Sequence, residues 1–446
     1  MFRRVSLDAL GLHRPELRAW AMYDWAVTGM WAVIVATVFP IYFQTVAADG
    51  LASEVATRNF ALATALGIVL VAVAAPVLGA ITDQRPWKKR FLAAFVVLGA
   101  SAAVALFWVD RGDWVLGLSL FILVNIGANG SAIFYDALLP HLADRDELDR
   151  VSAGAFAVGY LGAGLLLVVA LLVIEQPGWF GLPEGTLPAR LALASVGIWW
   201  AAFTLPLLLR VPEPPPAEAL AVEGEHRGAT ALAAARVLGT VRDLRSYRDA
   251  ALFLLAFLIY NDGVGTIIRM AAVYGAEVGI EQGALIGAVV LVQFVGVPAT
   301  FLFGNLASSW GAKRALFAGL AVYMGVTVLG FFMTSAVHFF VLAFLVGLVQ
   351  GGTQAISRSL FAAMIPRSFS GEFFGFFSVM EKFAGMVGPL VFALVIALTG
   401  SSRIAILSIF TFFAVGAVLL AMVDVEEGIR RADRDEVGLQ RGRVGT

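Results

Sequence analysis

The sequence predicts an all-α polytopic membrane protein in which twelve transmembrane helices form two pseudo-symmetric bundles of six. Three observations predict this fold: long apolar segments, an alternation of positive charge between the loops, and a repeat of the first half of the chain in the second. Apolar residues make up 60% of the 446 residues and charged residues only 14%. A soluble domain of this length would not need so much apolar surface.

Twelve segments are each long enough to cross a bilayer, because about 20 apolar residues in a helix span the hydrocarbon. Short polar connections separate them, except near the middle of the chain. The expected spans are Trp20–Ala47, Arg58–Thr82, Phe91–Val109, Trp114–Leu139, Val151–Ile174, Ala189–Leu209, Ala250–Ala276, Gln282–Leu306, Ala315–Thr334, His338–Ile365, Phe373–Leu398 and Ile404–Val423.

The long central connection divides the chain into domains. Residues 211–247 are expected to form a cytoplasmic linker, because their proline-rich start is typical of a stiff, extended spacer. The linker separates an N-terminal six-helix bundle, residues 1–210, from a C-terminal one, residues 248–423. Residues 424–446 mix acids with arginines and are expected to form a solvated cytoplasmic tail.

Positive charge gathers on one side of the predicted membrane. The N-terminus, the loops after even-numbered spans and the C-terminus hold nearly all lysines and arginines outside the spans. The opposite loops hold only Arg58, Arg111, Arg190 and Arg403. By the positive-inside rule both termini are cytoplasmic, and in a bacterium the protein would lie in the plasma (inner) membrane.

The two halves of the chain repeat one another. The glycine and basic pair after span two, Gly79 and Lys88-Lys89, align without a gap with Gly304 and Lys313-Arg314 after span eight. A further pair of equivalent positions differs in charge, with Asp136 in span four and Arg358 in span ten. A parallel repeat around a cytoplasmic linker is a layout of membrane transporters.

Polar side chains inside the spans are the candidates for function. A charge in hydrocarbon costs at least about 2.5–3.5 kcal/mol on insertion scales, so it is retained where it is paired or faces a cavity. Span one carries Asp24, Thr28 and Trp31 on one face. These residues are expected to contact a solute or proton. The alternative for Asp24 is a pair with a loop arginine.

Span four carries a polar stripe of Asn125, Asn129 and Asp136, and Tyr135 lies beside it. A polar stripe on an apolar helix predicts a face that lines a cavity. The alternative is hydrogen bonding between helices.

Span seven holds Asn261 and Asp262 about halfway across the membrane. Asp262 is the preferred candidate for proton coupling, because a carboxyl at that depth can bind and release a proton. The alternative is a structural ion pair with Arg269. Arg269 lies near the outer end of the span and could instead extend to the interface.

Span ten places Gln350, Gln354 and Arg358 on one face. Arg358 either clamps a solute carboxylate or pairs with an acid on a facing helix. In span eleven, Glu381 and Lys382 lie near the midplane. Adjacent helical residues point about 100° apart, so these two are not expected to neutralise each other. One of them is expected to face the cavity, with Glu381 as a second candidate for proton coupling and Lys382 as an ion-pair partner.

Enzymatic interpretations have little support in the sequence. The four histidines are scattered without metal-ligand spacing, and cysteine is absent, so no metal site is expected. The chain lacks a Gly-x-x-x-x-Gly-Lys-Ser/Thr loop for nucleotide phosphates and any nucleic-acid motif. We therefore expect no enzyme activity, no cofactor and no nucleic-acid partner.

The loop after span two resembles the loop signature of the major facilitator superfamily, carried here by Gly79, Asp83, Arg85, Lys88, Lys89 and Arg90. More specific segments are Ala21-Met-Tyr-Asp-Trp-Ala26, Tyr135-Asp-Ala-Leu-Leu-Pro140, Tyr260-Asn-Asp-Gly263 and Gln354-Ala-Ile-Ser-Arg-Ser359. Together they resemble the vacuole-effluxer family, the autophagy-related amino-acid effluxers and their bacterial relatives, along nearly the whole chain. The resemblance implies that spans one, four, seven and ten line the cavity. It also implies that Asp136 and Arg358 meet at an inner gate and separate when that gate opens.

The expected function is secondary transport of a small solute by alternating access. The preferred solute is an amino acid or similar zwitterion, and its transport is expected to be coupled to protons. The protein is expected to be a monomer surrounded by membrane lipid. One alternative is a proton-coupled exporter of amphipathic compounds, suggested by aromatic residues such as Trp31. Another is a non-transporting membrane receptor or lipid-handling scaffold.

Overall fold

The structure is a computed structural model that describes residues 10–216, 247–384 and 387–444, and it confirms the predicted all-helical membrane fold. Twelve helical segments of the described residues are long and apolar enough to cross a membrane. Those of the first half are α1 (Pro15–Met30) with its continuation to Ala47, α3 (Ser53–Gln84), α4 (Lys88–Ala105), α5 (Trp114–Leu142), α6 (Leu148–Glu175) and α7 (Leu187–Arg210). Those of the second half are α9 (Arg248–Glu277), α10 (Gln282–Trp310), α11 (Ala312–Phe331), α12 (Ala336–Ala363), α13 (Ser370–Phe383) with α14 (Val387–Thr399), and α15 (Ser402–Ser408) with α16 (Phe410–Met422).

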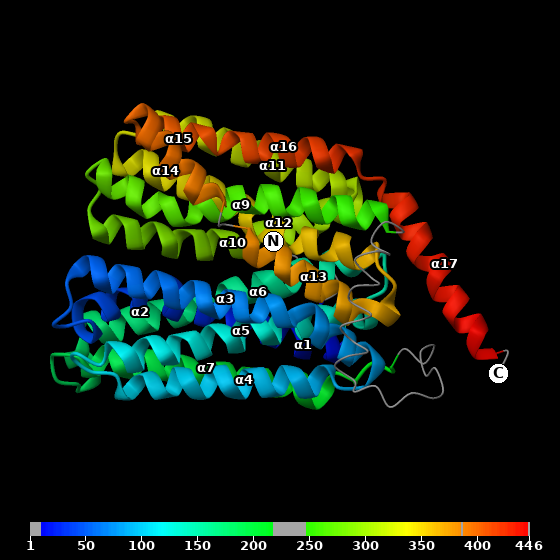
Figure 1. The fold of residues 1–446 in the computed structure, drawn as a ribbon, viewed down its shortest axis with the longest axis horizontal. Coiled ribbons are helices and arrows are strands. Elements are labelled where there is room, and N and C mark those ends of the chain that lie inside the picture. Colours follow the sequence, from blue (N-terminus) through cyan, green and yellow to red (C-terminus); the bar gives the residue numbers. More distant parts are fainter. Residues whose placement is uncertain (1–9, 217–246, 385–386, 445–446) are drawn as a thin grey trace, which may run out of the picture.

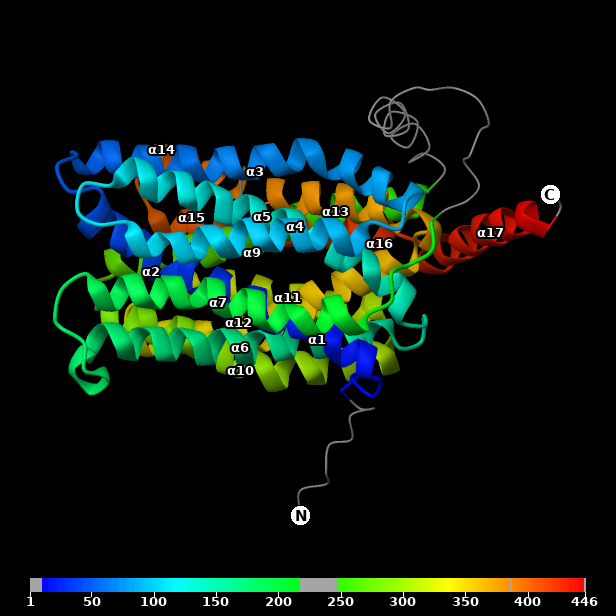
Figure 2. The same cartoon turned by 90° about the horizontal axis from the view of Figure 1, so that it is seen from below.

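The helices of the two halves lie side by side with roughly parallel axes. Figure 1 shows α9 to α12 and α14 to α16 above α3 to α7, with α13 reaching down to the level of α3, and Figure 2 shows the same bundle after a quarter turn. Contacts between the halves run through α6 with α10 and α12, and through α13 with α3 and α5. We call the side on which α1 begins and α7 ends, and on which α9 begins and α16 ends, the terminal side.

The first span is longer and less regular than a simple α-helix. After α1 the chain continues through a π-helical stretch (Trp31–Thr37), α2 (Val38–Tyr42) and a second π-helical stretch (Phe43–Ala47). Pro40 lies within this region; its ring has no N–H and would clash with the carbonyl one turn earlier. A proline is therefore a sufficient cause for the local widening of the helix there.

The eleventh span differs from the single helix predicted over Phe373–Leu398. It consists of α13 and α14, which are separate helices, and Ala384 after α13 has an extended backbone with φ −59° and ψ 130°. The backbone amide of Gly388 in the first turn of α14 donates to the carboxylate of Asp262 on α9. A carboxylate at a helix N-terminus satisfies amides that have no partner in their own helix, so α14 can begin inside the membrane.

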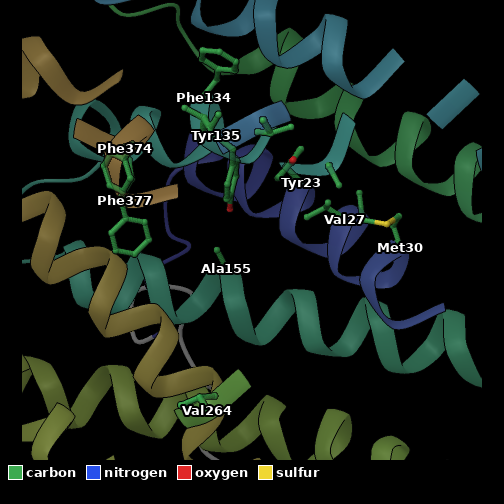
Figure 3. Close-up of a cluster of buried hydrophobic side chains, with 14 of the residues drawn as sticks. Tyr23, Val27, Met30, Phe134, Tyr135, Ala155, Val264, Phe374 and Phe377 are labelled. Carbon is green, nitrogen blue, oxygen red and sulfur yellow. The ribbon is translucent and has the colours of Figure 1, made fainter. Parts of the chain in front are cut away.

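Buried aromatic rings pack near the terminal side of the bundle. Figure 3 shows Tyr23 of α1 beside Tyr135 of α5, with Phe374 and Phe377 of α13 near them. All four side chains are nearly inaccessible to solvent. Because α5 and α13 come from different halves and contact each other, these buried rings lie where the two halves pack together.

The predicted tail is a helix in the structure. α17 (Val425–Val444) extends beyond the membrane-spanning bundle, as Figure 1 shows. Its Asp433 pairs with Arg145, which lies between α5 and α6, at 2.8 Å, and its Asp435 accepts from the Tyr247 hydroxyl at 2.6 Å. The predicted linker lies outside the described residues between 217 and 246.

Candidate functional site

A buried arginine joins the two halves near the terminal side. Arg358 of α12 is 3% exposed, and its Nη1 donates to Oδ1 of Asp136 on α5 at 3.1 Å. Its Nη2 lies 3.4 Å from Oδ2 of Asp24 on α1. Its Nε and Nη2 donate to the hydroxyl and the carbonyl of Ser152 on α6, at 3.0 and 3.2 Å. We call Asp24, Asp136, Ser152 and Arg358 the Arg358 cluster; through it, one side chain binds three helices of the other half.

Aromatic rings enclose the Arg358 cluster. Tyr135 donates its hydroxyl to Asp24 at 2.8 Å and stacks on Trp20, with ring centroids 4.5 Å apart. The Arg358 guanidinium lies over the rings of Phe156 and Trp20, 4.4 and 4.9 Å from their centroids. The ion pairs, hydrogen bonds and cation–π contacts offset the free-energy cost of burying the guanidinium charge away from water. The arrangement is that of an interface contact between helices.

A second contact between the halves uses the loop after α3. Asp83 is 1% exposed, and its two carboxylate oxygens accept from the backbone amides of Gly371 and Glu372 at 2.9 and 2.8 Å. Lys88 donates to the same carboxylate at 2.6 Å. Gly371 and Glu372 are in the first turn of α13, so Asp83 acts as a cap supplied by the other half of the chain.

Close backbone approach makes this cap possible. A Cβ atom added at Gly79 would lie 2.1 Å from the carbonyl oxygen of Gly371, and one at Gly375 would lie 2.7 Å from that of Ala75. Side chains at these positions would push α3 and α13 apart. The repeated Gly79 of the sequence therefore serves the packing of the two halves.

We expect Gly79→Ala to lower stability by about 1–3 kcal/mol, because the added methyl group meets backbone rather than a movable side chain. Thermal unfolding of the purified protein measures this. Gly325→Ala is the matched control: Gly325 lies within α11 and has nothing within 4 Å of an added Cβ, so the substitution should be neutral or slightly stabilising. Equal unfolding temperatures for the two variants would contradict the close contact.

The other basic residues of the loop signature have different surroundings. The Lys89 ammonium donates to the carbonyl of Val211 at 2.6 Å, which connects the loop to the start of the linker region. Arg85 lies over the Trp87 ring, 4.6 Å from its centroid. Arg85 and Arg90 are exposed. Of the six predicted signature residues, Gly79 and Asp83 therefore contact α13, and Lys88 pairs with Asp83.

A cavity of about 470 Å³ lies between the two halves, beyond the Arg358 cluster as seen from the terminal side. It reaches from Thr28 and Phe156 to Met333, which follows α11, and Phe339, in the first turn of α12. The end of α11 and the start of α12 lie on the side away from the terminal side. Phe156 contacts both the cavity and the Arg358 guanidinium. Three of the predicted cavity residues line it: Thr28, Trp31 and Gln350.

The asparagine stripe of α5 does not line this cavity, contrary to the prediction. Asn125 and Asn129 are 2% and 0% exposed. Each donates its side-chain amide one turn back along its own helix, to the carbonyls of Phe121 at 2.9 Å and Asn125 at 2.8 Å. A side chain that bonds to its own helix satisfies its donor without any solute.

The predicted polar residues of α9 and α12 meet each other. Gln354 donates to the side-chain oxygen of Asn261 at 2.5 Å, and Tyr260 hydrogen-bonds Ser357 at 2.5 Å. These bonds join two helices of the second half. Among the described residues that line the cavity, Asn261, Gln354, Asp24 and Tyr135 do not appear, contrary to the prediction.

Asp262 is 3% exposed and lies at the break in the eleventh span. The Gly388 amide donates to both of its carboxylate oxygens, at 3.1 and 3.0 Å. Arg269, two turns further along α9, is exposed and interacts electrostatically with it. The predicted proton site is thus bound to a helix N-terminus that sequence patterns did not reveal.

The expectation that Glu381 and Lys382 would not neutralise each other is wrong. The Lys382 ammonium lies 2.8 Å from Oε2 of Glu381. Both side chains are long, and both lie in the last turn of α13, so they can bend toward each other. The ammonium also lies 5.3 Å from the centroid of the Trp31 ring, which lines the cavity.

Sequence patterns missed several residues of the site. Ser152 is a small polar residue near the start of a span, and no spacing rule marks it as a partner of Arg358. Gln293 and Tyr160 line the cavity from α10 and α6. Both are isolated polar residues inside apolar spans, which is the feature that marked the other candidate residues of the chain.

Two halves of membrane-spanning helices, joined by charged contacts on one side of a central cavity, define a transporter of the major facilitator class. Solved structures agree on the fold. The human organic anion transporter MFSD10 is similar over 91% of this chain and 99% of its own, with a TM-score of 0.67 and 16% identity. The proton:xylose symporter XylE is similar over 95% and 97%, with a TM-score of 0.65 and 13% identity.

Sequence relatives identify the family. A family profile described as "Vacuole effluxer Atg22 like" matches residues 13–433, and the chain belongs to this family. The uncharacterized MFS-type transporter YxiO of Bacillus subtilis is 34% identical over 411 residues, which cover 92% of this chain and 94% of YxiO. Autophagy-related protein 22-1 of Penicillium rubens is 23% identical over 88% of this chain and 81% of its own. The chain is therefore a transporter-family member and not an enzyme.

Proposed function

We propose that the protein is a secondary transporter that exports a small organic solute by alternating access. One observation carries this proposal: the central cavity ends, toward the terminal side, at Phe156 and the Arg358 cluster. A cavity closed on one side by contacts that can separate is what alternating access requires. The description of the family as effluxers supports export. The Arg358 cluster and the Asp83 cap would form the inner gate.

We propose that both termini face the cytoplasm and that the protein lies in a bacterial plasma membrane. The distribution of arginine and lysine supports the orientation, and the Bacillus relative supports the membrane. A single cysteine at the C-terminus tests the orientation, because the chain has none of its own. A membrane-impermeant maleimide should label it in broken cells and leave it unlabelled in intact spheroplasts. Labelling in intact spheroplasts would show that the C-terminus lies outside the cell and would contradict the proposed orientation.

The amino-acid solute expected from the family resemblance is not supported by the cavity. Its polar lining residues are mainly threonines, tyrosines and glutamines, and none of the described residues that line it is charged. The acids and arginine expected to hold a zwitterion instead bind each other in the Arg358 cluster. A buried charge without a partner is costly, so a zwitterion fits this wall poorly.

We expect proton-linked transport to depend on Asp262. Asp262→Asn keeps the shape of the side chain but can no longer gain or lose a proton. The variant should lose uphill transport driven by a proton gradient and retain solute exchange. Two labelled probes in proteoliposomes, leucine and the neutral blocked dipeptide N-acetyl-diphenylalanine amide, measure both reactions. Thr266→Val is a control for a substitution beside the site, because the Thr266 hydroxyl donates to the backbone carbonyl of Asp262 at 2.7 Å and its loss leaves the Asp262 carboxyl in place. Uphill transport at the wild-type level in Asp262→Asn would rule out the proton role.

A further inference from the structure

The central cavity has a wall that selects against charge. Its surface is formed by aliphatic and aromatic side chains from the π-helical stretch Trp31–Thr37 and from α6, α9, α10, α11, α12 and α15. Most of its few polar groups already have partners within the protein. The Tyr274 hydroxyl donates to the Gly330 carbonyl at 3.2 Å, and the Thr327 hydroxyl donates to the Met324 carbonyl at 2.7 Å. Gln350 interacts with the Tyr160 hydroxyl.

One polar atom on the wall is different. Gln293 of α10 lines the cavity, and its side-chain oxygen is buried and has no hydrogen-bond partner among the residues that the structure describes. A buried acceptor without a donor is unfavourable, and a bound molecule that donates an N–H or O–H would satisfy it. Gln293 therefore marks the position of a hydrogen-bond donor on an otherwise apolar ligand.

Size sets a further limit on the ligand. A cavity of about 470 Å³ falls within the range of pockets that enclose drug-sized molecules. A single small amino acid would leave much of the apolar wall without contacts. The wall gains most from a molecule that covers several of its aliphatic and aromatic groups at once.

We propose that the cavity binds an uncharged, largely apolar organic molecule that donates a hydrogen bond to Gln293. This inference rests on the proposed transport function and names its solute class. The class differs from a zwitterion in charge rather than in size. Two molecules with the same side chains and different end groups therefore distinguish the two classes.

The test compares diphenylalanine, a zwitterion, with N-acetyl-diphenylalanine amide, which has the same two aromatic rings and no charge. Binding to the purified full-length protein is measured by calorimetry. The neutral compound should bind at least about tenfold more tightly, since the free dipeptide must desolvate two charges that meet no partner. Equal or tighter binding of the free dipeptide would overturn the proposed solute class.

Three variants test whether the molecule binds in the cavity and beside Gln293. Ala343→Phe fills part of the cavity and should abolish binding of the neutral compound, whereas Ala201→Phe, on an exposed position of α7, should not. Gln293→Leu keeps the volume but removes the acceptor and should weaken binding about fivefold. Wild-type binding in Ala343→Phe would overturn the cavity as the site.

Two further outcomes contradict the inference. The first is binding of neither compound. The second is a lipid that stays with the purified wild type, is lost in Ala343→Phe and excludes the neutral compound; it would assign the cavity to an acyl chain. Alternating access is tested separately from the solute class, by cysteine labelling of the gate and the cavity without any solute.

Discussion

Arg358→Gln should open the terminal side of the protein and lower its stability by about 3–5 kcal/mol, the typical cost of removing one partner from a buried ion pair. Arg358 is within hydrogen-bond distance of Asp136 and 3.4 Å from Asp24. Without it, two carboxylates remain close together in a buried site. They should repel each other and favour the state in which α1 and α5 move away from α12.

A cysteine reporter measures the opening. Ser378→Cys is suitable, because Ser378 of α13 is 5% exposed and its buried hydroxyl has no hydrogen-bond partner within the described ranges of the chain. Maleimide labelling from the terminal side should be slow in the reporter alone and fast when Arg358→Gln is added. Arg111→Gln is the control, since Arg111 is an exposed arginine whose ion pair with Asp49 is at the surface.

The coupling between Asp136 and Arg358 is measured by a double-mutant cycle with Asp136→Asn. The double variant should be more stable than the sum of the single effects predicts, because it removes a charge that Arg358→Gln leaves unpaired. The recovery should be partial, since Asp24 remains. Strict additivity would show that the two residues do not act as a pair.

The second large effect is expected at Asp83. Asp83→Asn removes the charge opposite Lys88, which is itself only 3% exposed, and turns an amide nitrogen toward a backbone N–H of α13. We expect a loss of about 3–5 kcal/mol and faster labelling of Ser378→Cys. Adding Lys88→Met should recover part of the stability, because the unpaired ammonium is gone.

Arg90→Gln is the control for the Asp83 variants, because Arg90 belongs to the same loop and is exposed. It should leave both the stability and the labelling rate unchanged. A double variant Asp83→Asn/Lys88→Met that is as unstable as Asp83→Asn alone would show that the cap on α13, rather than the pair with Lys88, carries the effect.

The fold was predictable because its signals are local. Each span is recognisable by its length and apolar composition. The repeat of Gly79 by Gly304 identifies the two halves without any knowledge of packing. The break between α13 and α14 was not predictable in this way. It depends on a carboxylate from α9, Asp262, which is distant in sequence.

The site was predictable only in part, for a related reason. Equivalent positions and opposite charges, together with the inner gate that the family resemblance implies, paired Asp136 with Arg358. The same reasoning failed for Asn125 and Asn129, because a helical stripe shows which residues share a face but not whether their amides bond to their own helix. Ser152 contributes through its backbone carbonyl as well as its hydroxyl, and a carbonyl has no sequence signal.

The most direct test of the account compares two single-cysteine proteins in sealed membranes. Ser378→Cys reports on the terminal side, and Ala343→Cys reports on the cavity. An impermeant maleimide applied to the face opposite the terminal side should label Ala343→Cys in the otherwise wild-type protein, while Ser378→Cys should stay protected from the terminal side. Adding Arg358→Gln should reverse both rates, with Ser378→Cys labelled faster and Ala343→Cys more slowly. If the two rates rise together, or if neither changes, Arg358 does not hold a gate and alternating access through this cavity is contradicted.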